Sequence, residues 1–322
     1  GDAVVNSPFD LFSQFGFLNE EILGSSLPVF KREYSEILDA SHPLVQNIMR
    51  KNNARFAPLI VAKNPDGSAR YRNLDKLKKI IEPYSMRVTK EECLDLPPKI
   101  YEKRYFKLDV TQRVMYNAMR DEFKFQLADE TISITHKLTL LLRLQQLTCG
   151  VVVDDKGVVR SLYPEPKENP RIKILLETLE DIDDSVIIWC RFQEDIRNIC
   201  SVLGDQAVPY YGEVDNKSRL DNLTAFKEGR AKFLVGTAAS GGIGLNLTRA
   251  ATAIYYSNTF NGGQRWQSED RCHRIGQEAD KVLYIDIEAE NTIDAKIIAA
   301  LRSKKDLSDF MLDFQNTSAN WV

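Results

Sequence analysis

The sequence lacks the features that mark several large classes of protein. It contains no apolar run of 18 residues and no N-terminal stretch that resembles a signal peptide, which argues against a membrane protein or a secreted one. Its five cysteines are scattered without a CxxC pair, and its three histidines form no ligand-like group, which argues against a disulfide framework and a metal site. Basic residues are not in excess, because the formal net charge is −3. Any contact with nucleic acid therefore has to come from a local patch.

Two motifs that hold a nucleoside triphosphate and its metal ion are also missing. No GxxxxGK(S/T) phosphate loop occurs, and GEVDNKS at 212–218 lacks the second glycine before its lysine. No Asp-Glu-x-His box occurs either. A nucleotide-hydrolysing motor needs a phosphate loop and an acidic metal-binding box. We therefore expect that this chain, by itself, does not hydrolyse ATP.

What is present begins with a largely helical, polar region over the first 95 residues. One amphipathic helix is expected to begin near Ser7-Pro8, and another is expected at 74–81, ending before Pro83. Between 96 and 168 the pattern is mixed. It predicts a strand at 101–108, a helix at 111–127, a helix at 134–147 and a hairpin at 151–162.

The helix at 111–127 has Asp109 placed as its cap. Its apolar side chains recur at helical spacing, and such a stripe is nearly always part of a core. We expect the stripe to consist of Val114, Met115, Ala118, Met119 and Phe123.

From Arg171 onward, predicted helices alternate with short apolar strands. The strands are expected at 185–190, 207–211, 232–236, 252–256 and 281–287. The helices are expected at 172–182, 193–203, 217–226 and 293–312. Short buried strands that alternate with helices are typical of a parallel sheet covered on both faces, so the sequence predicts an α/β fold.

The stretch 233–277 combines features that suit an anion. A strand leads into a glycine-rich turn at 240–244 and then into a short helix expected from Leu245. A polar helix is expected to carry Arg271 and Arg274, which would then share one face and reach the same phosphate chain. The glycines alone are weak evidence, since GGxG is often only a tight turn.

The full run is more specific. TAASGGIGLNL at 237–247 and QSEDRCHRIGQ at 267–277 resemble helicase motifs V and VI of the Swi/Snf family of double-stranded-DNA translocases. The resemblance covers residues 1 to about 314 in family order. Two places depart from the family pattern: LRLQQLTCG at 142–150, and NTFNGG at 258–263, where glycine replaces an expected proline. The second departure suggests a diverged, bacterial or viral member.

The resemblance implies the C-terminal half of an ATP-dependent DNA translocase. Residues 1–95 would be the end of motor lobe one with a helical protrusion, and 96–168 the linker and the protrusion of lobe two. Residues 169–316 would form a RecA-like helicase C-terminal lobe, and 317–322 a tail. The implied partners are double-stranded DNA, ATP with Mg²⁺ held mainly by the absent lobe one, and the N-terminal motor lobe itself. The implied location is intracellular and soluble: a bacterial or viral-host cytoplasm, or the nucleus in a eukaryote.

The resemblance also assigns roles to single residues. Arg271 and Arg274 match the arginines of motif VI, with Arg274 favoured as the arginine finger and Arg271 as its phosphate-side or structural partner. The other matches fall into two groups. The nucleotide-binding group is Gly242, Gly244, Asn246 and Gln267. The DNA-binding group is Arg191, Tyr211, Gly212, Thr237 and Ser240.

Other interpretations stay open from the sequence. The arginines could be surface ion-pair residues, and the DNA-facing positions could be ordinary turn chemistry. The chain could also be a DNA-binding or adapter module without enzymatic activity on the same fold. A nucleotide-binding oxidoreductase would rest on Gly242-Ile-Gly244 alone and lacks the third glycine of its motif. His273 is expected to be packed and hydrogen-bonded, without acting as a base.

Overall fold

The computed structural model describes residues 7–64, 69–85, 95–128, 134–154, 157–240 and 245–302. The chain divides into two compact units, Gly1–Cys93 and Leu94–Val322.

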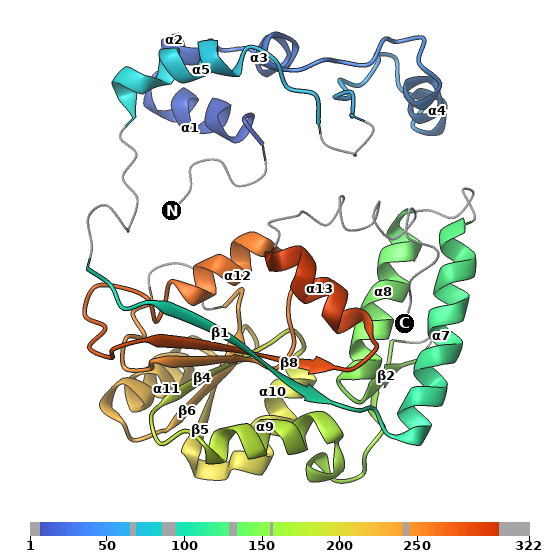
Figure 1. Cartoon of the computed structure of the whole chain (residues 1–322). Helices are drawn as coiled ribbons and strands as arrows, with labels where there is room; N and C mark the ends of the chain where they lie inside the picture. The colour runs from blue at the N-terminus through green and yellow to red at the C-terminus, as the bar shows by residue number, and fades with distance from the viewer. Residues whose placement is uncertain are drawn as a thin grey trace. The chain divides into compact units, whose positions relative to one another are not determined.

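The first unit is a group of short helices (Figure 1). They are α1 (Asp10–Leu18), α2 (Glu20–Leu23), α3 (Leu27–Tyr34), α4 (Pro43–Lys51) and α5 (Leu74–Ile81), followed by the 3₁₀ turn η1 (Glu82–Tyr84). The Ser7 hydroxyl accepts the N–H of Phe9 at 3.2 Å, so α1 begins where the sequence predicts. Helix α5 has the predicted bounds and ends before Pro83. A small core rich in aromatic residues holds the helices together; it consists of Leu11, Phe15, Phe30, Tyr34 and Leu77.

The second unit is built on a six-stranded sheet in which every neighbouring pair is parallel. The strands are β1 (Lys99–Phe106), β4 (Val186–Cys190), β5 (Ala207–Tyr210), β6 (Phe233–Thr237), β7 (Thr252–Tyr255) and β8 (Val282–Ala289). Their order across the sheet is β1-β8-β7-β4-β6-β5. Strand β1, expected in the segment before the alternating region, is an edge strand of this sheet and pairs with β8 along its whole length. The predicted parallel α/β fold is confirmed.

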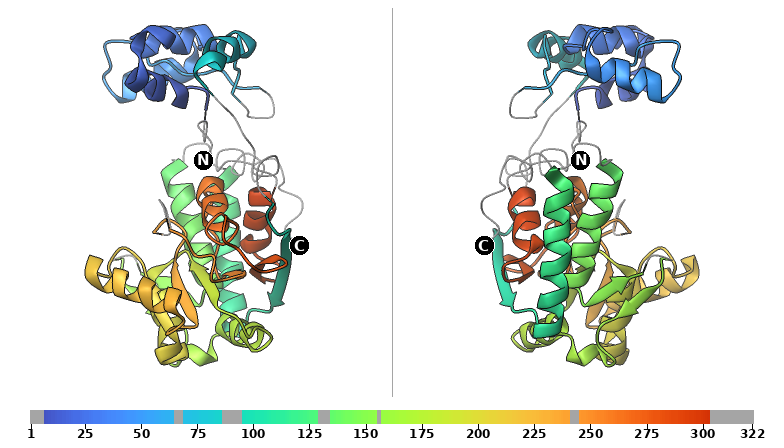
Figure 2. Two further views of the ribbon diagram at one scale, coloured as in Figure 1. Left: turned by 90° about the vertical axis from the view of Figure 1, so that its left-hand side faces the viewer. Right: turned by 90° about the vertical axis from the view of Figure 1, so that its right-hand side faces the viewer.

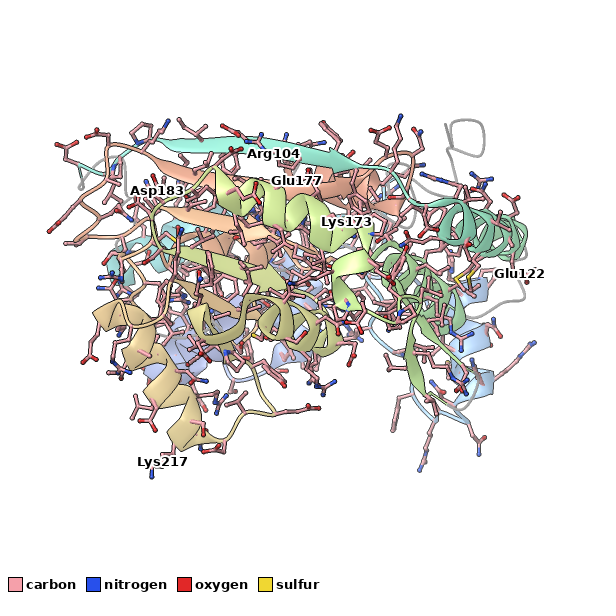
Figure 3. The ribbon with its side chains drawn as sticks, turned by 90° about the horizontal axis from the view of Figure 1, so that it is seen from below. Arg104, Glu122, Lys173, Glu177, Asp183 and Lys217 are labelled. Carbon is pink, nitrogen blue, oxygen red and sulfur yellow. The ribbon has the colours of Figure 1, made fainter. Side chains whose placement is uncertain are left out.

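Seven helices of the described residues surround the sheet. They are α7 (Val110–Ala128), α8 (Ile134–Thr148), α9 (Pro170–Glu180), α10 (Gln193–Leu203), α11 (Asn216–Glu228), α12 (Gly262–Glu269) and α13 (Ile293–Arg302). Helices α9 and α10 pack on one face and α11 on the other, which explains why all five side chains of β4 are buried. Helix α9 turns Ile172 and Leu175 inward and Lys173 and Glu177 to solvent (Figure 3). The predicted extension of α13 from 303 to 312 and the tail lie outside the described residues.

Helices α7 and α8 lie side by side beyond one end of the sheet (Figure 2), and the hairpin β2 (Val151–Val153) and β3 (Val159–Ser161) follows as predicted. Asp109 caps α7 by accepting the N–H of Gln112 at 2.8 Å. The predicted apolar stripe is wrong in part, because Val114 is 63% exposed. The buried face carries Gln112 and Tyr116, whose Nε2 and hydroxyl bond to backbone groups of α8 and α13 at 2.6 and 2.7 Å. With these two hydrogen bonds, α7 directs Gln112 and Tyr116 toward the core and leaves Val114 at the surface.

Candidate functional site

The carboxyl ends of the parallel strands gather several predicted DNA-binding residues at one edge of the sheet. Arg191 directly follows β4, Tyr211 directly follows β5, and Thr237 is the last residue of β6. Strands β5, β6 and β4 are neighbours, so these three positions are adjacent. Tyr211 itself is 9% exposed, whereas Gly212 beside it is exposed. The edge is where open parallel sheets commonly bind ligands.

The hydroxyl groups of Thr237 and Ser240 close a tight turn after β6. Thr237 Oγ1 accepts the N–H of Ser240 at 3.1 Å and donates to its hydroxyl at 2.9 Å. Ser240 Oγ lies 2.8 Å from the carbonyl oxygen of Tyr210 in the neighbouring strand. The two strands approach so closely that a Cβ on Gly236 would lie 2.3 Å from that carbonyl oxygen. A phosphate at this turn would compete with bonds that the two hydroxyls already make.

Arg191 is held by the segment that follows β7. Its backbone N–H donates to the Ser257 hydroxyl at 2.8 Å, and its Nη1 donates to Thr259 Oγ1 at 3.1 Å. The Ser257 hydroxyl donates in turn to the buried carboxylate of Asp195 at 2.9 Å. Burial lowers the pKa of the Arg191 guanidinium. The side chain is therefore half-buried and oriented, with its position fixed through two hydroxyl groups.

We expect Asp195 to make the stability of the second unit depend on pH. Burial raises the pKa of its carboxyl to about 7 from an ordinary value of 3.8, against smaller opposing effects of Ser257 and Arg171. Between these values the folded state binds more protons than the unfolded state, so the free energy of unfolding falls as pH rises, by up to about 1.4 kcal/mol per pH unit. This stabilisation is complete below the unfolded pKa and is lost by about pH 7. We expect Asp195→Asn to remove the slope, as measured by urea unfolding at several pH values from 4.5 to 8. An unchanged slope would contradict this account.

The two candidate arginines lie in a turn, not in a helix. Helix α12 ends at Glu269, and the next turn is closed by bonds from the N–H groups of Cys272 and His273 to the Glu269 carbonyl, at 3.3 and 3.2 Å. The predicted helix through Arg271 and Arg274 is therefore wrong. The predicted helix from Leu245 is also wrong, since residues 245–250 contain no helix.

A backbone bond ties the two signature segments together: the N–H of Leu247 donates to the Arg271 carbonyl at 3.1 Å. The Arg274 side chain is exposed, with Nη1 3.5 Å from the Leu245 carbonyl oxygen. Arg271 is half-buried, and burial together with the positive charge of Arg274 lowers the pKa of its guanidinium. Two positive charges that disfavour each other in this way would both be stabilised by a nearby anion.

The other predicted nucleotide-binding residues are placed less tightly. Asn246 is exposed, and its Oδ1 accepts the N–H of Thr248 at 3.3 Å, which closes a local turn. Gln267 is exposed on α12. Gly242 and Gly244 lie outside the described residues. No described contact brings Asn246 and Gln267 together, so their assignment stays a prediction.

The sequence reading missed Arg265, which anchors α12. Its side chain is 6% exposed and donates to Glu269 Oε1 at 2.9 Å, to Asn258 Oδ1 at 2.6 Å and to Asp286 Oδ1 at 2.5 Å. Its guanidinium carbon lies 3.3 Å from the ring centroid of Tyr255. The available signal was the Arg265–Glu269 spacing of i,i+4. Nothing in the sequence pointed to Asp286 as the second partner.

Comparisons with known proteins match two family models to different parts of the chain. A model of the SNF2-related domain matches residues 1–151, and a model of the helicase conserved C-terminal domain matches residues 170–276. The chain carries SNF2-related and helicase C-terminal domain sequences. Its parallel sheet flanked by helices is the RecA-like architecture of SNF2 ATPase domains.

Individual relatives extend the match. An uncharacterized ATP-dependent helicase of Mycoplasma genitalium is 26% identical over 95% of the chain and 27% of its own length. One of Mycoplasma pneumoniae is 29% identical over 70% of the chain and 22% of its own length. The SWI2/SNF2 ATPase core of Sulfolobus solfataricus in complex with double-stranded DNA is 26% identical, with a TM-score of 0.51 over 96% of this chain and 60% of that one. The chain thus spans about a quarter of the length of the two Mycoplasma relatives.

Two features are absent from the part of the chain that the structure describes. No group of three or more His, Cys, Asp or Glu side chains there is arranged to hold a metal ion. No helix there is long and apolar enough to cross a membrane.

His273 is buried, and its Nε2 lies 2.9 Å from the Pro97 carbonyl oxygen, which confirms that it is packed and hydrogen-bonded.

Proposed function

We propose that this chain supplies the second motor lobe of an ATP-dependent double-stranded-DNA translocase. In this proposal residues 1–95 belong to the end of the first lobe, 96–168 to the linker and second protrusion, and 169–316 to the RecA-like second lobe. ATP and Mg²⁺ are held mainly by a first lobe that carries the phosphate loop, and Arg274 and Arg271 reach the phosphates from the second.

The observation that carries the proposal is the turn after α12 that carries Arg271 and Arg274, here called the arginine turn. Arg271 and Arg274 are near enough for their charges to interact, and Leu247 ties their turn to the segment after the glycine-rich loop. An exposed guanidinium beside a half-buried one can neutralise charge that develops on a transferred phosphoryl group. The residues present fit the phosphates of ATP in this way. ATP would supply the phosphoryl group that is transferred; its binding would close the two lobes and its hydrolysis would open them.

The polar edge formed by Arg191, Tyr211, Gly212, Thr237 and Ser240 is the proposed DNA-facing surface. Phosphate contacts of this kind are independent of base sequence and weaken as salt rises. Alternating grip by two lobes would then move the protein along one strand.

The test is DNA-stimulated ATP hydrolysis by the chain extended upstream of Gly1 through its own reading frame. We expect turnover that duplex DNA stimulates in the extended protein, and none in the 322-residue chain. If the extended protein binds duplex DNA and does not hydrolyse ATP, the chain is a DNA-binding or adapter module instead. If it does neither, the proposal fails.

The edge makes its own prediction. Arg191→Ala should weaken duplex binding by the 322-residue chain uniformly across sequences, and should reduce the slope of log affinity against log salt by about 1. Fluorescence anisotropy with two unrelated labelled duplexes at four salt concentrations measures both effects. Arg230→Ala removes an equal charge on a distant surface turn, where the guanidinium pairs with Glu228, and should change neither. Equal losses in the two variants would contradict a specific role for Arg191.

A further inference from the structure

Strand β1 makes side-chain contacts with the arginine turn in addition to its pairing with β8. The Tyr101 hydroxyl donates to Glu269 Oε2 at 2.8 Å, and Lys99 Nζ lies 3.3 Å from the same oxygen. Lys99 Nζ also lies 3.5 Å from Asp270 Oδ1. Just before the strand, the Pro97 carbonyl oxygen lies 2.9 Å from His273 Nε2. Three residues at the start of β1 therefore hold the residues on both sides of Arg271.

Glu269 is the centre of these contacts. Its side chain is 6% exposed, with Oε1 bonded to Arg265 and Oε2 bonded to β1. Its carbonyl oxygen accepts the Tyr284 hydroxyl at 2.8 Å and the N–H groups of Cys272 and His273. Glu269 thus closes the arginine turn through its backbone carbonyl and contacts β1 through its side chain.

These contacts are separable from the fold of the strand. Backbone pairing joins β1 to β8 in register from Lys99–Val282 to Phe106–Ala289, and no part of it needs the Tyr101 hydroxyl. The Tyr101 ring also stacks on Tyr284, with centroids 5.3 Å apart, and phenylalanine would keep that contact. Removing the hydroxyl therefore removes one bond to a buried carboxylate and little else.

We propose that Lys99 and Tyr101 are positioning residues that fix the arginine turn through Glu269. Strand β1 is the first element of the second unit, so the chain that arrives from the first unit enters the sheet at the point that grips this turn. The start of β1 and the turn that carries the two arginines are thereby connected by direct contacts. The effect on catalysis rests on the proposed function, whereas the effect on the turn does not.

The turn is tested first in the 322-residue chain, without nucleotide or DNA. Hydrogen exchange is measured for the amides of Cys272 and His273, which donate to the Glu269 carbonyl. We expect Tyr101→Phe to speed their exchange by about tenfold. The variant removes the hydrogen bond to the charged Glu269 carboxylate, and hydrogen bonds to charged groups are among the stronger ones. The Glu269 residue, and with it the carbonyl that accepts these amides, is then held less firmly. Tyr105→Phe is the matched control, because Tyr105 lies on the same strand, is 52% exposed and has no described bond to Glu269. Equal exchange in the two variants overturns the proposal.

Catalysis is tested in the upstream-extended protein. We expect Tyr101→Phe and Lys99→Met to lower kcat for DNA-stimulated ATP hydrolysis by about 3–10-fold, with little change in the KM for ATP. A misplaced arginine pair weakens an interaction made in the transition state and leaves ground-state binding largely unchanged. Lys99→Arg keeps the charge beside Glu269 and should restore most of kcat. A rise in KM without loss of kcat, or no difference from Tyr105→Phe, overturns the positioning role. If the unsubstituted protein lacks ATPase activity, the proposed function fails and the exchange result alone decides whether β1 holds the turn.

Discussion

Arg274→Ala in the upstream-extended protein should lower kcat for DNA-stimulated ATP hydrolysis by about 10³-fold or more. An arginine that reaches the transferred phosphoryl group from a second lobe contributes roughly 10³–10⁵ in rate. The structure makes this variant a clean one, since the Arg274 side chain is exposed and its nearest described contact is a 3.5 Å approach to the Leu245 carbonyl. Loss of activity would therefore not come from loss of the fold. Steady-state kinetics at saturating duplex DNA measures the effect.

Two companion variants sharpen this test. Arg274→Lys keeps a positive charge and removes the planar fork that binds phosphate oxygens in pairs, so it should recover only a small part of the activity. Arg230→Ala removes an exposed arginine paired with Glu228 and should keep full turnover. Full turnover in Arg274→Ala would show that the finger is misassigned. Arg271, which is half-buried, would then be the next candidate.

The core of the fold was predictable because its central strands β4, β6 and β7 are buried on both faces. The run Val186–Cys190 has no polar alternation, and this pattern requires helices on both sides of a parallel sheet. Local signals fixed single elements as well. Asp109 marks the start of α7, and Pro83 follows the end of α5. Such signals act within a few residues, and therefore a sequence reading recovers them.

The conformation of the arginine turn was not predictable in the same way. Its residues have no helix-breaking proline, and Gly276, with φ +93°, comes after both arginines. The contacts beside the end of α12 come from other parts of the chain: the Leu247 N–H donates to the Arg271 carbonyl, and the Tyr101 hydroxyl donates to Glu269. Contacts between residues about 170 positions apart leave no periodic trace in the sequence.

The exposed stripe of α7 has the same origin. Apolarity favoured the face of Val114 and Met115, yet the buried face carries Gln112 and Tyr116, which bond to backbone groups of α8 and α13. A buried polar side chain with a backbone partner can outweigh two apolar ones left at the surface. Arg265 was missed for a related reason, since a charged residue was not expected to be the anchor of a core.

Arg265→Met should destabilise the second unit by about 3–5 kcal/mol. The Arg265 and Asp286 side chains are 6% and 1% exposed, and removing the guanidinium leaves a buried carboxylate without its main partner. Asn258 donates to Asp286 at 2.9 Å and Arg302 lies 3.8 Å away, so the carboxylate keeps only part of its stabilisation. Urea unfolding of the 322-residue chain, followed by circular dichroism, measures the loss.

A double variant separates the cost of the stranded charge from the value of the pair. Replacing both partners, as Arg265→Met with Asp286→Leu, should recover a large part of the loss, because a buried ion pair exchanged for apolar side chains is often close to neutral. Recovery will be incomplete, since Asn258 and Glu269 then each lose a partner. Arg230→Met, at an exposed pair, should cost no more than about 1 kcal/mol and serves as the control. A loss below about 1 kcal/mol in Arg265→Met alone would show that Arg265 does not anchor α12.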